Sequence, residues 1–200
     1  MDLTDVDKQE SAFFDDETLA LDAEFHQQIN SYLAHAPGKH PADLAGLIAF
    51  DNRDRVEQVH FDQEIFQEAQ GTAPADQNPT AQAARQRARD TAQKLIDGYL
   101  KTDDLDAIVA LTNVPAWKTT YFRPDGHGDD FGFGSSSPAA VAGYPDVTVP
   151  AGFAGPGNAL PVGISFFGAQ WHDADMVDLA AAFEDSTHAR HAPTYLRTVG

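Results

Sequence analysis

The chain has 200 residues and contains no cysteine. The absence of thiols excludes disulfides, thiolate zinc sites and a cysteine nucleophile, and it fits a cytoplasmic protein. No apolar run reaches the length that a membrane-spanning helix needs. Residues 1–16 have neither the basic start nor the apolar centre of a secretory signal peptide. These absences predict a cytoplasmic protein with no membrane partner.

Cations are scarce as well. Thirteen Lys and Arg residues face thirty-one Asp and Glu residues, which gives a formal net charge of −18. Such a charge repels a nucleic-acid backbone, so no nucleic-acid partner is expected. The Asp-rich, Lys-poor composition is typical of proteins from salt-loving microbes, where molar salt screens self-repulsion. An ordinary acidic soluble protein is the alternative interpretation.

The first half of the chain shows helical periodicity. Apolar residues recur every three or four positions, as on the buried face of an amphipathic helix. Residues 1–18 are acidic and lack this period, so the sequence predicts a flexible N-terminal segment there. The predicted helices cover residues 18–35, a short stretch beginning at His40-Pro41, residues 60–70 and residues 80–101. The longest of them carries an alanine-rich apolar row and an exposed cluster formed by Arg85, Arg87 and Arg89.

The second half changes its pattern to short continuous apolar runs. Such runs are typical of buried strands. They predict strands at 107–111, buried on both faces, at 147–150 and at 162–167. Small helices are expected near 137–143 and from an N-cap at Asp173 to about His188. Helices around these strands predict an α/β fold, a mixed β-sheet flanked by helices, as one domain over residues 19–200.

The segment from Gly134 to Gly168 reads GSSSPAAVAGYPDVTVPAGFAGPGNALPVGISFFG. It resembles the C-terminal part of the amidase signature family, whose sheet is completed by a "GYP…VTVPAG" strand and a "LPVGISFFG" strand. Three further segments, 43–69, 104–117 and 178–196, resemble the family in the same order. The peptide-amidase-like members are the most similar in appearance. The resemblance covers about residues 19–196 and implies the C-terminal part of the amidase-signature fold.

The resemblance also implies what the chain lacks. In whole family members, a Lys deprotonates a cis-Ser, which activates a Ser nucleophile against the amide carbonyl. Backbone N–H groups of a GGSSGGS-type loop hold the oxyanion. These parts come from the N-terminal half, and this sequence has no such loop. We therefore expect no catalytic residue here, no cofactor and no metal. The expected partners are a small amide substrate and an N-terminal amidase half, in cis or in trans.

Two groups of residues are candidates for lining the substrate cleft. Ser135, Ser136 and Ser137 lack the glycines of the nucleophile loop, so they are expected to line the cleft or to form a helix cap. Thr112, Asn113 and Trp117 follow the first predicted strand, at the strand end where ligands collect in open α/β sheets. A packed Trp with ordinary turn residues is the equal alternative.

Two other functions remain open. A non-catalytic module could bind a ligand or partner, and an exposed apolar sheet edge would argue against it, because half of a domain must leave such an edge. A metal-dependent hydrolase could use His127 with the neighbouring Asp125, Asp129 and Asp130. His188 and His191 also lie close in sequence. Neither His spacing matches a zinc motif.

Overall fold

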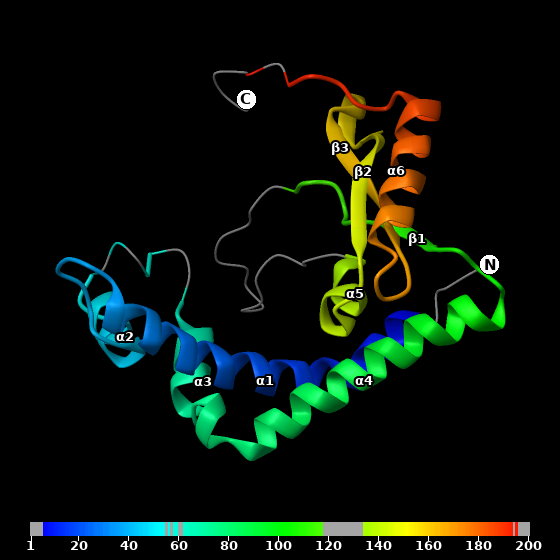
Figure 1. Ribbon diagram of the computed structural model, residues 1–200. Coiled ribbons are helices and arrows are strands. Elements are labelled where there is room, and N and C mark those ends of the chain that lie inside the picture. The colour runs from blue at the N-terminus through cyan, green and yellow to red at the C-terminus, as the bar shows by residue number, and fades with distance from the viewer. Residues whose placement is uncertain are drawn as a thin grey trace. The chain divides into compact units, whose positions relative to one another are not determined.

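The computed structural model describes residues 6–54, 56, 58–59, 62–117, 134–193 and 195. Its contacts divide the chain into two compact units. Among the described residues, those up to Ala92 form the first unit and those from Gln93 form the second. The boundary lies inside one long helix, so each unit is described by itself (Figure 1).

The first unit is helical. Its elements are α1 (Val6–His35), α2 (Leu44–Asp51), α3 (Glu64–Gly71), the 3₁₀ turn η1 (Ala75–Gln77) and most of α4 (Pro79–Thr102). Helix α1 contacts α2, α3 and η1. The predicted alanine row of α4 is buried, with Ala84 and Ala92 fully inaccessible. The periodicity therefore identified the buried face of this helix correctly.

Helix α1 begins at Val6, well before the predicted start at Thr18. Phe13 lies in the added part and is buried, with 1% of its surface exposed. Asp16 accepts two hydrogen bonds from Arg87, at 2.9 and 2.5 Å, and these bonds hold the pKa of the Asp16 carboxyl below its usual value. Arg85 pairs with Glu24 at 2.6 Å. The arginines predicted to be merely solvated thus connect α4 to the acidic helix, although their side chains stay largely exposed.

The second unit contains the sheet. Strands β1 (Ile108–Leu111), β2 (Asp146–Ala154) and β3 (Leu160–Phe167) form an antiparallel sheet in the order β1-β3-β2. All three predicted strands are confirmed, and so is the mixed α/β class. A bulge between Pro150 and Gly152 interrupts the β2–β3 register. The 3₁₀ turn η2 (Pro156–Asn158) joins these two strands.

Helix α6 (Asp173–Thr187) packs along one face of the sheet (Figure 1). The core there consists of Val149, Phe166, Met176 and Ala180. Phe183 meets Phe166 edge-on, with ring centroids 5.8 Å apart. The N-cap of α6 is His172 rather than the predicted Asp173.

Strand β1 differs from its prediction. Only Ile108 is buried, whereas Val109 is 47% and Leu111 is 55% exposed. In the described residues β1 lies at an edge of the sheet and pairs on one side only, with β3. The expectation of a strand buried on both faces was therefore wrong, because a continuous apolar run does not specify whether a neighbour is present. The helices of the described part all lack the combination of length and hydropathy needed to cross a bilayer.

Candidate functional site

The end of β1 and the start of α5 (Ser136–Ala142) meet in a short seam. Asn113 and Gly134 form an isolated antiparallel bridge, and the Ser135 N–H donates to the Thr112 carbonyl at 3.2 Å. The Thr112 N–H in turn donates to the Gly163 carbonyl on β3 at 3.0 Å. The structure therefore brings together three of the six predicted cleft residues, namely Thr112, Asn113 and Ser135.

Helix α5 fixes the position of the serine run. Ser135 is its N-cap and is only 3% exposed, but its side chain makes no capping hydrogen bond. The buried Oγ of Ser135 has no hydrogen-bond partner among the described residues. Ser136 is exposed and Ser137 is partly buried in the first turn of the helix. A buried hydroxyl without a partner costs free energy, so Ser135 is not explained as a simple cap.

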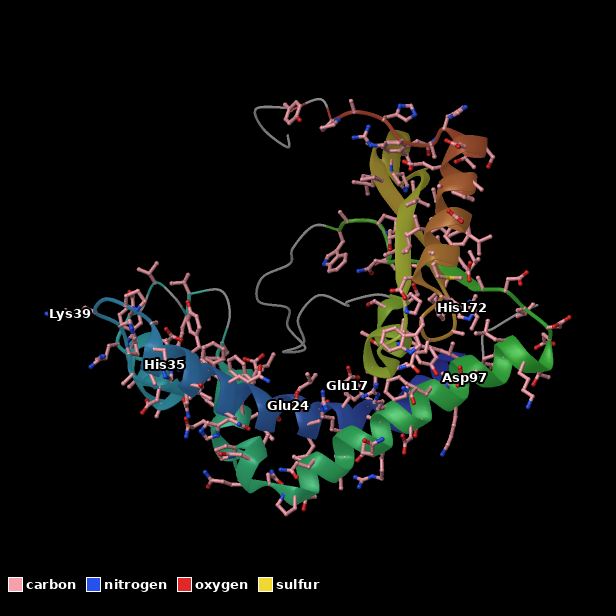
Figure 2. The ribbon with its side chains drawn as sticks, viewed as in Figure 1. Glu17, Glu24, His35, Lys39, Asp97 and His172 are labelled. Atoms are coloured by element: carbon pink, nitrogen blue, oxygen red, sulfur yellow. The ribbon has the colours of Figure 1, made fainter. Side chains whose placement is uncertain are left out.

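Neighbouring elements hold α5 in place. Helix α5 contacts β2, and its Ala142 carbonyl accepts a hydrogen bond from Gln93 Nε2 at 2.9 Å. Tyr144 Oη, in the turn after α5, donates to Asp97 Oδ2 at 3.0 Å, and Figure 2 labels Asp97 on α4. Trp117, the last described residue before 134, is 45% exposed.

Three hydroxyl groups converge beside the seam, and we call them the hydroxyl cluster: Thr112, Thr148 and Ser165. Ser165 Oγ lies 3.0 Å from Thr112 Oγ1 and 2.9 Å from Thr148 Oγ1, and the two threonine oxygens are 3.3 Å apart. Ser165 is fully buried, Thr112 is partly buried and Thr148 is exposed. Strand alternation places all three on the face of the sheet opposite the α6 core.

Gly163 makes this convergence possible. It lies on β3 next to Pro150 of β2, and a Cβ there would come within 2.9 Å of Thr148 Cγ2 and 3.0 Å of Thr112 Oγ1. Both distances are shorter than ordinary van der Waals contact. The missing side chain leaves the space in which side chains from β1 and β2 meet across the central strand.

A carboxylate lies behind the hydroxyl cluster. Asp146 begins β2, and burial raises the pKa of its carboxyl, while a hydrogen bond with Ser165 acts in the opposite direction. The buried Oδ1 of Asp146 has no partner among the described residues. The site therefore combines one half-buried acid with a chain of hydroxyls that leads to the exposed Thr148.

Asp146, Thr148, Gly163 and Ser165 were not among the site residues predicted from the sequence. A usable signal existed, since Thr148 and Ser165 are single polar residues within strongly apolar strands. On the inner face of a strand such residues need hydrogen-bond partners. Which residues are those partners depends on strand register, and the sequence alone does not provide that register.

A second concave region lies in the second unit. A groove of about 950 Å³ separates the distal part of the β2–β3 hairpin from residues 189–193 and 195. Phe153 contacts His191 edge-on at 5.1 Å across it. His191 therefore packs on the hairpin. Arg190 also lines the groove.

The sequence suggested two candidate metal sites, and the structure describes only the one that contains His188 and His191. His127 and its acidic neighbours lie outside the described residues. Within the described ranges, no three His, Asp or Glu side chains come together as metal ligands.

Comparisons with known proteins relate the chain to amidases. No family model matches it. It is 31% identical over 183 residues to a probable amidase from Arabidopsis thaliana, a match that covers 90% of this chain and 31% of the relative. The peptide amidase from Stenotrophomonas maltophilia shares the fold with a TM-score of 0.78 and 36% identity, over 93% of this chain and 36% of that one. An amidase family protein from Bacillus anthracis gives a TM-score of 0.65 at 25% identity, over 87% and 30% of the two chains.

The predicted resemblance to the C-terminal part of amidase signature enzymes is confirmed by these relatives. The chain spans 31% of the plant relative and 36% of the bacterial peptide amidase. The described sheet and helices thus correspond to about a third of those proteins.

Proposed function

We propose that this chain forms one wall of the active-site cleft of an amidase that hydrolyses amide C–N bonds. The nucleophile, its proton acceptor and the oxyanion donors come from a polypeptide segment outside these 200 residues. That segment is joined to this chain in cis or associates with it in trans. The 200-residue chain alone is inactive, and the substrate is a small amide.

Among the described residues, β1 is an edge strand with no neighbour on its outer side, and this observation carries the proposal. Val109 and Leu111 project from the same face and are both about half exposed. Soluble proteins usually protect such an edge with charges, prolines or a covering element. An apolar, unprotected edge is expected of a sheet that continues into another segment, and it disfavours an independently folded binding module.

The serine run does not supply a nucleophile by itself. Ser135 Oγ is buried and has no hydrogen-bond partner among the described residues, so Lys39, Lys94 and Lys101 do not bond to it. Lys118 lies outside the described residues. Nucleophilic catalysis needs a base within hydrogen-bond reach of the hydroxyl and donors for the oxyanion. In this proposal Thr112 and the serine run shape the wall of the cleft and do not attack the amide.

We propose a cytoplasmic location. The support is compositional, since a cysteine-free chain has no requirement for an oxidising environment.

The test is a chimera. The peptide amidase from Stenotrophomonas maltophilia has its matching region replaced by this chain, and amide release is measured for the chimera and for the isolated 200-residue chain. We expect turnover from the chimera and none from the isolated chain. Losing a catalytic unit whose members act together costs many orders of magnitude in rate, so the two results are easily distinguished.

A triple variant of the isolated chain, with Ser135, Ser136 and Ser137 each changed to Ala, is the control. Turnover by the isolated chain that disappears in this variant would place the active site in this chain and overturn the proposal. A folded chimera without activity would also contradict it.

A further inference from the structure

The groove beside the β2–β3 hairpin has the size and the lining of a small-molecule site, and we call it the hairpin groove. Its volume of about 950 Å³ lies within the range of sites that bind small molecules. Phe153 and Pro161, paired across the two strands, line it on the hairpin side, and Ala192 and Pro193 line it on the other side. The edge-on contact between Phe153 and His191 joins the two walls. The walls are therefore apolar and connected, as expected of a site that encloses an apolar body.

The bulge in β2 shapes the hairpin wall. Pro150 and Gly152, at the two ends of the register shift, both line the groove. A bulge bends its strand and re-aims a neighbouring side chain, which here is Phe153. Gly152 has a φ of +144°, a conformation that residues with side chains rarely adopt. The strand thus carries no side chain at the point where the wall turns.

The charge of the hairpin groove is opposite to that of the chain. Among the described residues that line it, none is Asp or Glu, whereas Arg190 brings a permanent positive charge. The chain as a whole has 31 acidic residues and 13 Lys and Arg residues, so its summed field repels anions. An anion that enters the groove meets a guanidinium and an apolar wall, with no carboxylate in the described lining to compete for Arg190.

We propose that the hairpin groove binds a small monocarboxylate with an apolar body, such that Arg190 pairs with the carboxylate and the walls enclose the body. The planar guanidinium matches a carboxylate through parallel N–H donors. A doubly charged phosphate is less suitable, because Arg190 follows closely after the C-terminal end of α6, where helix carbonyls carry partial negative charge. A second copy of this chain is unsuitable as well, because two chains of net charge −18 repel each other. The groove has no lining residue in common with the Thr112–Ser135 seam, so this site is independent of the proposed amidase function.

Binding to the intact 200-residue chain tests the proposal. Alanine methyl groups are labelled with carbon-13, and NMR spectra are recorded during titration with cinnamate or with cinnamyl alcohol, which has the same apolar body but no charge. The methyl signals of Ala159, Ala189 and Ala192 should shift, because these residues line the groove, whereas that of the buried Ala84 on α4 should not. We expect cinnamate to bind at least about tenfold more tightly, the ratio expected from one hydrogen bond to a charged group.

Matched variants separate the charge from the apolar contact. Arg190→Gln keeps a polar side chain but removes the charge, so the preference for cinnamate should disappear. Arg89→Gln makes the same change in net charge at an exposed position of α4 outside the groove, so it should keep the preference. Phe153→Ala removes part of the apolar wall, so both probes should bind several-fold more weakly while the preference stays. The dispersion of the methyl signals reports whether each variant is folded.

Equal affinity for cinnamate and cinnamyl alcohol, or unchanged signals from the three groove alanines, would overturn the proposal. A full preference in Arg190→Gln, or an equal loss of preference in Arg89→Gln, would do the same. The titration is repeated on the chimera with the Stenotrophomonas maltophilia enzyme, where cinnamate should still bind. Loss of binding in the chimera would mean that the segment outside these 200 residues fills the groove, and it would refute the inference. None of these measurements depends on turnover, so this proposal and the proposed amidase function can fail separately.

Discussion

Replacing Gly163 with alanine is the most direct test of the packing beneath the proposed cleft wall. The new Cβ would lie 2.9 Å from Thr148 Cγ2 and 3.0 Å from Thr112 Oγ1. Optimal carbon contacts are about 3.5–4.0 Å, so both neighbours must move by several tenths of an ångström. Overpacking of this kind costs about 1–3 kcal/mol.

The higher strand preference of alanine over glycine offsets part of this steric cost. Gly163 does not adopt a positive φ, and glycine inside a regular strand is less favourable than alanine by roughly 0.5–1 kcal/mol. At mid-range, a steric cost of about 2 kcal/mol less a gain of about 0.75 kcal/mol leaves a net loss of roughly 1.25 kcal/mol. A domain of this size loses about 2–4 °C in Tm per kcal/mol, so Gly163→Ala should lower Tm by roughly 2–5 °C.

The assay is thermal unfolding followed by circular dichroism, at one fixed salt concentration. Thr148→Ser deletes the methyl group nearest to the new Cβ, so the double variant should recover part of the loss beyond simple additivity. Gly98→Ala in α4 is the matched control, because a Cβ at Gly98 meets nothing within 4 Å and should raise stability by up to about 1 kcal/mol. A Gly163→Ala protein as stable as the parent would refute the packing argument.

Three further predictions concern the rest of the chain. Because the net charge is −18, Tm should be higher in molar potassium chloride than in low salt, where the Debye length is longer; an unchanged or lower Tm in high salt would contradict this. Burial raises the pKa of Asp146 in the folded protein, so its carboxylate opposes folding as pH rises through that pKa. Asp146→Asn should therefore raise Tm at pH 7, and the gain should shrink below the unfolded value of 3.8; a gain of the same size at both pH values would contradict this. Phe13→Ala should cost about 3–5 kcal/mol in urea unfolding, whereas Phe14→Ala, at a position 63% exposed, should cost little; similar losses would show that the start of α1 is misplaced.

Local pattern was sufficient to predict the regular elements. The three strands follow from short apolar runs, and the buried face of α4 follows from alanines spaced at three and four residues. Both features are determined within a few residues of the chain. The contact between Thr112 and Ser135 was not predicted, although the sequence singled out both residues because they flank recognisable elements.

The structure departs from the prediction where residues distant in sequence determine the local conformation or exposure. The acidic start of α1 has no helical period, but Asp16 is bonded to Arg87, which lies far along the chain. The hydroxyl cluster forms only when Thr112, directly after β1, Thr148 on β2 and Ser165 on β3 are brought side by side by the strand register. The exposure of β1 depends on which strand lies beside it, and its own four residues do not specify that. The division into two units was not predicted either, because its boundary falls inside the continuous helix α4.

The bridge between Asn113 and Gly134 has an evolutionary consequence. It holds Asn113 and Gly134 side by side, so the chain that joins these two residues must begin and end at adjacent points. The entropy of closing such a loop changes slowly with length, by about 0.6 kcal/mol for each doubling. Insertions, deletions and wholesale replacement between these points therefore place little demand on the strands. The strands of the sheet and the chain that joins Asn113 to Gly134 are therefore free to change at different rates in evolution.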